Sequence, residues 1–564
     1  MTQRDGEPHF GFFAPGEVAL IVEHEAPLSR DALLRALRAV PLVRDNLALS
    51  RAVEFADAST SVTTTNRRPP VSEAAGCARI ISAVFDVLLN RGVQSPSTPQ
   101  AASTSPAYLS SVFVNVGQVG DEWNDPRALI ERLIAPLDEA LENGGGQGER
   151  VAITGVAPNW FISSAQPILT VGGPGARPVA PNRMKATTSG VDPWMFRFFD
   201  DQGTLLDLGD GHGVDIFVLD TVPTREQFER AYNNGQPLNP MLGQLIAPDG
   251  SFSLNNRRFE VRYSGSTKPE IDRLGSHTQG VGVSGHDYEM LDHGLFASGI
   301  AALVAPAARV TLMEVLGRWG VGSLRTILDA LNTLTQRPAS RPMVVNLSLT
   351  FDIPFSKHLV HHADLPLFQT EWSWFTQWLD EHESFVSRSL SAVEEACRAL
   401  KTQHKALVIA AAGNDSFGAE QRRDPRFPAA FGAVVGVGAL SSNRQPAPYS
   451  NRPDTPEAVG VIVFGGDVDA SGATGLLSPN ANAPSTNPQT GILGLYIGTL
   501  PDGTQPPDGW VRWAGTSFSA PIVTGFLATA LGKGKTPTQA LAALEAAAAE
   551  TPGQSQRLNV TQGL

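Results

Sequence analysis

The chain has 564 residues, of which 42% are hydrophobic and 18% are charged, a composition typical of globular proteins with one or more large domains. Its formal net charge of −13 at pH 7 argues against a nucleic-acid partner held by phosphate contacts. The two cysteines, Cys77 and Cys397, lie far apart and match no metal-ligand spacing. Stability is therefore not expected to depend on a disulfide framework.

The N-terminus shows no secretory signal peptide, because residues 1–7 lead into no long apolar run. No stretch reaches the roughly 18 apolar residues that a membrane-spanning helix needs. We therefore expect a cytoplasmic protein without a membrane partner.

Residues 1–160 predict a smaller α+β N-terminal domain. Its expected strands are 17–22, 110–116 and 151–154, and its expected helices are 30–40, capped by Ser29, and 126–141. A Ser-, Thr- and Pro-rich stretch at 94–106 predicts a loop or linker. The rise in Pro and Gly over 161–209 predicts a junction between domains.

Residues 210–550 show apolar strands alternating with helices, which predicts a mostly parallel sheet whose sites lie outside the carboxyl ends of its strands. The expected strands are 214–219, 308–315, 342–349, 406–412 and 433–440, and the expected helices are 321–334, 386–402 and 537–549. Insertions are expected near 225–285, 351–384 and 465–490. The second insertion is rich in aromatic residues and either caps the site or packs elsewhere. Its aromatic residues are Trp372, Trp374, Phe375 and Trp378.

Four polar residues occupy positions suited to acyl transfer. Asp220 ends an apolar strand, and His293 opens an apolar helix. Asn414 follows a strand, and Ser517 stands where a Gly-containing turn becomes a helix. Unpaired N–H groups and the dipole at a helix start favour the negative charge that a nucleophile creates there.

Taken singly, each of these residues has an ordinary explanation. Asp220 and Asn414 suit turns, His293 suits a helix start, and Ser517 suits an N-cap. Their joint occurrence in one α/β region, in the order Asp, His, Asn and Ser, favours a catalytic site.

At these motifs the chain resembles the subtilisin-like serine proteases (subtilases), in particular a bacterial branch without signal peptides. The matching stretches are Val218-Leu219-Asp220-Thr221, His293-Gly294 with Ser298-Gly299-Ile300, Val345 to Leu349, Ala411-Ala412-Gly413-Asn414, and Gly515-Thr516-Ser517-Phe518-Ser519-Ala520-Pro521. The resemblance covers about residues 210–535 and implies a three-layer α/β fold with a mostly parallel sheet.

The resemblance implies a serine endopeptidase acting through an Asp-His-Ser triad. Ser517 would attack the peptide carbonyl, His293 would transfer the proton, and Asp220 would orient the imidazole. Asn414 and the Ser517 backbone N–H would hold the oxyanion.

The resemblance also implies where the protein or peptide substrate binds. The edge formed by Ser348, Leu349 and Thr350 would pair with the substrate backbone. Ala411, Ala412 and Gly413 would line the pocket for the side chain that precedes the cleaved bond. These small walls leave room for a large apolar side chain, whereas Asp415 suits a basic one.

Some positions depart from the family pattern, including Val222-Pro223 after the aspartate and Leu295 after His293-Gly294. None of them removes a reacting group. No metal and no cofactor is predicted.

The N-terminal domain has two interpretations. It acts either as a propeptide-like inhibitor that is removed by self-processing, or as a regulatory module that recognises a partner. Two rival functions stay open for the whole chain, a peptide-processing transpeptidase and a regulatory module on a degenerate protease fold.

Overall fold

The structure is a computed structural model that describes residues 12–54, 62–67, 108–163, 176–181, 194–200, 202–235, 238–277, 289–338, 340–351, 353, 373–416, 419–455, 460–469, 486–549 and 556–562. The linker predicted at 94–106 lies outside these residues, as do Cys77, Trp372 and most of the segment 465–490.

A nine-stranded sheet forms the centre of the larger region, and all its neighbouring strands run parallel except β17 and β18. In pairing order the strands are β17 (Ala548–Ala549), β18 (Gln556–Leu558), β14 (Gly460–Phe464), β13 (Val435–Leu440), β12 (Leu407–Ala411), β10 (Met343–Leu347), β6 (Asp215–Asp220), β8 (Arg309–Glu314) and β7 (Phe259–Arg262).

Helices cover both faces of this sheet. They are α10 (His293–Val304) and α16 (Thr516–Gly532) on one face, and α11 (Leu324–Thr335) and α15 (Ser391–Gln403) on the other. In β6, Ile216 and Val218 belong to the buried cluster of α10 and α16, whereas Phe217 and Leu219 belong to the cluster of α11 and α15. Because successive strand residues point to opposite faces, both faces are buried. The predicted three-layer α/β fold is confirmed.

A six-stranded antiparallel sheet carries the N-terminal region. Its strands are β1 (Phe13–His24), β2 (Val62–Asn66), β3 (Tyr108–Asn115), β4 (Ala152–Ser163), β9 (Val321–Ser323) and β11 (Thr350–Phe351). Its helical elements are α1 (Arg30–Ala39), α2 (Pro41–Arg44), α3 (Leu47–Glu54), η1 (Val116–Gln118), η2 (Asp121–Asn124), α5 (Pro126–Ala128), η3 (Leu129–Ile134) and α6 (Ala135–Glu142). Since β9 and β11 come from the larger region, the two regions share this sheet.

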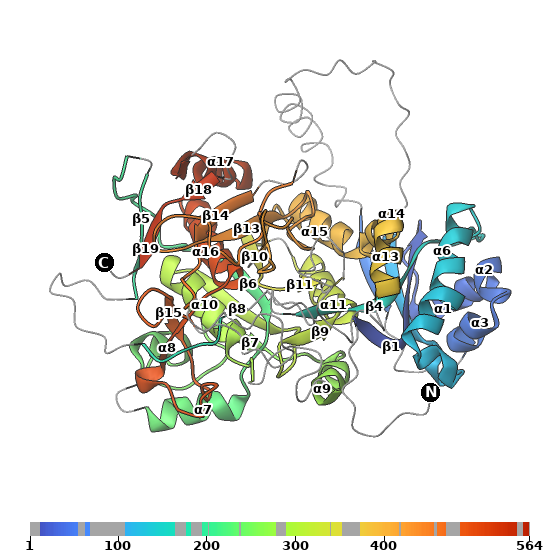
Figure 1. Ribbon diagram of the computed structural model, residues 1–564, viewed down its shortest axis with the longest axis horizontal. Helices are drawn as coiled ribbons and strands as arrows, with labels where there is room; N and C mark the ends of the chain where they lie inside the picture. Colours follow the sequence, from blue (N-terminus) through green and yellow to red (C-terminus); the bar gives the residue numbers. More distant parts are fainter. Residues whose placement is uncertain are drawn as a thin grey trace, which may run out of the picture.

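The two regions also share a hydrophobic core, as Figure 1 shows where the blue N-terminal elements lie beside the orange helices α13 (Ser373–Glu381) and α14 (Glu383–Ser389). Trp160 of β4 stacks on Phe375 of α13 with ring centroids 6.1 Å apart, and it lies 6.3 Å from Phe385 of α14. In its described part, the aromatic-rich insertion therefore packs against the N-terminal region.

The start of one helix was predicted wrongly. The helix expected from Val321 begins at Leu324, because Val321–Ser323 pairs with β4 as strand β9. Ser323 then caps the helix, since its hydroxyl accepts a hydrogen bond from the Thr326 N–H. By contrast, the predicted cap at Ser29 is confirmed.

The remaining elements lie around the large sheet. They are β5 (Phe196–Phe198), α7 (Arg225–Asn234), α8 (Pro240–Ile246), α9 (Lys268–His277), β15 (Ile492–Leu495), η7 (Pro507–Gly509), β16 (Trp510–Trp513), α17 (Pro537–Ala547) and β19 (Val560–Gln562). Among the helices that the structure describes, none has the length and apolar character needed to cross a bilayer.

Candidate active site

The end of β6 and the start of α10 bring Asp220 and His293 together. The imidazole Nδ1 of His293 lies 2.8 Å from Oδ1 and 3.0 Å from Oδ2 of Asp220, and both side chains are buried. The Thr221 backbone N–H donates to Asp220 Oδ1 at 2.7 Å. Because Asp220 accepts from Nδ1–H, the neutral ring carries its lone pair on Nε2.

Thr221 and Gly294 hold this pair in place. The Thr221 hydroxyl donates to the Met290 carbonyl at 2.8 Å and accepts from the Gly294 N–H at 3.1 Å. A Cβ on Gly294 would lie 2.1 Å from the Thr221 carbonyl oxygen, so only glycine permits this close approach of helix to strand. The His-Gly motif therefore has a steric cause.

Two aromatic rings surround the imidazole of His293. Its centroid lies 5.4 Å from that of Trp513, edge to face, and 5.1 Å from that of Phe518. Phe518 directly follows Ser517, so this contact brings the imidazole to the start of α16. The buried Nε2 makes no hydrogen bond to any described residue.

Ser517 is buried in the first turn of α16 and contacts Ser348. The Ser348 hydroxyl donates to the Ser517 carbonyl at 2.7 Å, and the Ser517 hydroxyl donates to the Ser348 carbonyl at 3.4 Å. This second bond is long, and the structure shows no hydrogen bond between Ser517 Oγ and His293 Nε2. The three triad candidates thus lie in one site, with the serine hydroxyl directed to Ser348.

Asn414 lies beside the same helix start. Its Oδ1 accepts from the backbone N–H of Thr516 at 3.0 Å and from the Thr516 hydroxyl at 3.1 Å. The amide group is thereby oriented, and Nδ2 lies 3.6 Å from the position of a Cβ on Gly515. A buried amide donor held in this way can stabilise a negative charge that forms at Ser517.

The chain's own β4 pairs with Thr350, one of the three residues of the edge that was predicted to bind substrate. Ser163 pairs with Thr350 of β11 and with Val321 of β9, while Ile162 pairs with Phe351 on one side and with Gly322 on the other. The end of β4 therefore lies between two edge strands, in the manner of an added strand. In this antiparallel register Ser163, the last residue of β4, lies opposite Thr350, the β11 residue nearer to Ser348 in sequence.

The other predicted pocket residues lie where β12 ends. Ala411 and Ala412 are fully buried, and the Gly413 N–H donates to the Thr516 hydroxyl at 3.3 Å. The segment 411–413 thus contacts the start of α16 through Gly413, and the segment 348–350 contacts it through Ser348.

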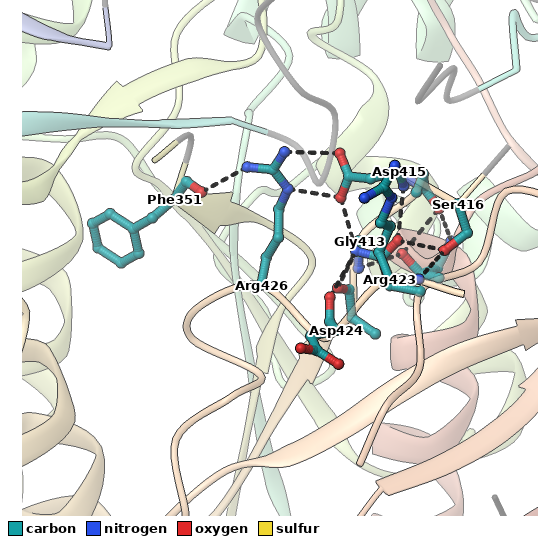
Figure 2. A network of polar contacts seen from close by, with 11 residues as sticks. Phe351, Gly413, Asp415, Ser416, Arg423, Asp424 and Arg426 are labelled. Carbon is teal, nitrogen blue, oxygen red and sulfur yellow. Dashed lines mark hydrogen bonds and ion pairs between the residues drawn. The ribbon is translucent and has the colours of Figure 1, made fainter. Parts of the chain in front are cut away.

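Asp415 was considered a partner for a basic substrate side chain, but it has an internal partner. Its carboxylate oxygens lie 2.7 Å and 2.8 Å from Nε and Nη2 of Arg426 (Figure 2). Both side chains are buried, and Asn451 also donates to the carboxylate. Sequence patterns gave no signal for Arg426.

A buried polar network was also missed, because its members are far apart in sequence. The Asn159 amide of β4 donates to Glu17 of β1 at 2.7 Å and to Glu270 of α9 at 2.9 Å. The side-chain amide oxygen Oδ1 of Asn159 accepts from the backbone N–H of Arg325 at 3.1 Å. Burial, and then the Glu17 carboxylate, raise the pKa of Glu270. The network connects the N-terminal region to the start of α11.

Asp292, next to His293, is a second buried carboxylate. It accepts from the backbone N–H groups of Ile497 at 2.6 Å and Gly498 at 3.2 Å. Burial raises the pKa of Asp292 to about 7. Among the described residues, no three His, Cys, Asp or Glu side chains gather closely enough to hold a metal ion.

The model of the Subtilase family (Peptidase_S8) matches residues 211–564, which is more than half of the sequence. The parallel three-layer fold and this match define a serine peptidase. The chain belongs to the subtilase family and is a subtilisin-like serine endopeptidase, so its substrates are proteins or peptides.

Two solved structures are similar to this chain. A cold adapted subtilisin-like serine proteinase is 19% identical, with 64% of this chain and 93% of that chain covered and a TM-score of 0.35. A lanthipeptide protease is 19% identical, with 62% and 84% covered and a TM-score of 0.36. No curated protein matches the sequence.

Proposed function

We propose that Ser517, His293 and Asp220 form the catalytic triad of this peptidase. The observation that carries the proposal is the buried pair of His293 and Asp220 beside the helix that begins at Thr516. The Ser517 hydroxyl makes only a long bond of 3.4 Å to the Ser348 carbonyl, and we expect it to turn toward His293 Nε2 when substrate binds. Catalytic hydrogen bonds are often long before substrate binds.

In the first chemical step, Ser517 Oγ attacks the peptide carbonyl while His293 Nε2 takes its proton. The imidazolium then protonates the leaving amine, and an acyl-enzyme forms. A water molecule next attacks the ester, again through His293, and releases the acid. Asp220 keeps the ring in the productive tautomer and stabilises its positive form.

Asn414 supplies one donor of the oxyanion hole, together with the Ser517 backbone N–H. We expect Asn414→Ala to lower kcat by about 100- to 1,000-fold with little change in KM, because the donor acts in the transition state. Steady-state hydrolysis of a peptide ester checks this. A kcat within a few-fold of wild type would show that groups other than Asn414 stabilise the oxyanion.

The N-terminal region restrains the enzyme and is separated from it by self-cleavage. Two observations support this proposal. The end of β4 fills the groove between β9 and β11, and its direction leads toward Ser517. The bond cut first lies C-terminal to Ser163.

Intact mass of the purified wild type beside Ser517→Ala tests catalysis and self-cleavage together. We expect two wild-type fragments, with the new N-terminus beyond Ser163, and a full-length variant. Full-length wild type that still hydrolyses added peptide would overturn self-cleavage alone. Fragments in both proteins would assign the cut to another protease.

The Asn159 network supplies a test of the restraint. Asn159→Leu leaves Glu17 and Glu270 without the amide that separates them, so the N-terminal region should bind more weakly by about 1–3 kcal/mol. Peptide hydrolysis by the whole chain should rise by up to about 100-fold. Asn143→Leu is the matched control, because Asn143 is exposed in the same region. Equal rates in both variants would contradict the restraint.

A further inference from the structure

Residues 426 and 427 connect two segments beside Ser517, namely residues 411–413 and strand β11. The Arg426 N–H donates to the Ala412 carbonyl at 2.9 Å, on the side formed by residues 411–413. The Phe351 N–H donates to the Phe427 carbonyl at 2.9 Å, on the side formed by β11. Residues 426 and 427 therefore close the space between these two walls.

The Arg426 side chain crosses from one wall to the other. Its Cγ lies 3.4 Å from the position of a Cβ on Gly413, and its Nη1 donates to the Phe351 carbonyl at 3.3 Å. Figure 2 shows the extended side chain between Asp415 and Phe351. The side chain is only 3% exposed, so it is buried where the two walls meet.

This crossing side chain is fixed. Asp415 binds the guanidinium at two points, 2.7 Å and 2.8 Å, and Asn451 Nδ2 donates to the same carboxylate at 2.8 Å. Moving Arg426 aside would separate a buried ion pair, which is strongly unfavourable because each charge is left without its partner. The arginine thus acts as a rigid floor.

We infer that Arg426 determines specificity, closing the pocket for the side chain that precedes the cleaved bond. The inference rests on the proposed function and adds its substrate class: peptides with a small residue, such as alanine or serine, at that position. The pocket is too shallow for an aromatic side chain. A lysine or arginine side chain would face the Arg426 guanidinium, because Asp415 is already paired with it. The chain's own sequence continues after Ser163 with two small residues, Ser164 and Ala165.

The test uses peptides that differ only in the residue before the cleaved bond, which is Ala, Ser, Glu, Lys or Phe. For the wild type we expect kcat/KM for Ala to exceed that for Phe and Lys by about 100-fold or more. The double variant Asp415→Asn/Arg426→Ala removes both charges together. Its ratio of Phe to Ala hydrolysis should rise by about 100-fold.

Arg452→Ala is the matched control, because this half-exposed arginine of the same region pairs with Asp424 and lies outside the floor. It should keep the wild-type ratios. Labelling of Ser517 by a fluorophosphonate probe reports an intact site in each variant. If the double variant does not fold, the kcat/KM values of the wild type for the set of peptides still test the inference. Preference of the wild type for Phe, Lys or Glu would overturn the inference. Absence of both labelling and hydrolysis in the wild type and also in Asn159→Leu, in which the restraint is weakened, would instead refute the proposed triad.

Discussion

Ser517→Ala is expected to lower kcat for peptide hydrolysis by about a millionfold, and to abolish labelling by a fluorophosphonate probe. The reason is that, in the proposed mechanism, this hydroxyl forms the covalent bond to the substrate and the three triad residues act as a unit. The measurement is kcat for a peptide ester, together with the mass of the labelled protein.

Ser519→Ala is the control for this substitution. Ser519 lies two residues along the same buried helix, and its hydroxyl donates to the Val463 carbonyl at 3.3 Å. We expect labelling and activity within a few-fold of wild type. Labelling that persists in Ser517→Ala would show that another residue is the nucleophile.

Asp292 is expected to make the protein less stable as the pH rises. Burial raises the pKa of Asp292 to about 7, well above the ordinary value of 3.8 for an aspartate, so the folded protein binds this proton more tightly than the unfolded chain does. The sign follows: this contribution to stability is fully present below about pH 4 and is lost as the pH rises through 7. The loss is on the order of 4 kcal/mol.

Asp292→Asn keeps an oxygen acceptor for Ile497 and Gly498 but cannot ionise. In a Ser517→Ala background, which prevents autolysis, we expect urea unfolding of Asp292→Asn to show a smaller drop between pH 4.5 and pH 8.5. Asp249→Asn, an exposed substitution, should retain the drop of the parent. Equal pH profiles for Asp292→Asn and its parent would show that the buried carboxyl ionises without cost.

The sequence predicted the large sheet and its helices well, because both depend on local patterns. The apolar run from Val214 to Leu219 predicted a strand buried on both faces, and β6 has this property. The apolar residues after His293 likewise predicted a buried helix, observed as α10.

Features that depend on distant pairing could not be predicted. Val321–Ser323 carries a weak signal of its own and becomes a strand only because β4 lies beside it. Asn159 and Arg426 both lie outside the strands and helices that the sequence predicted. Their roles depend on partners more than one hundred and about ten positions away. The Asp220 and His293 pair was expected from the resemblance, whereas no spacing pattern defines it.

The hydrophobic core that joins Trp160 to Phe375 and Phe385 has a consequence for the proposed self-cleavage. Cleavage of the connecting peptide does not by itself separate the two fragments, because dissociation of the N-terminal fragment would expose these aromatic rings to water. The nicked product should behave as a tight heterodimer of fragments. Full release of the protease would then require a second event that unfolds or degrades the N-terminal fragment.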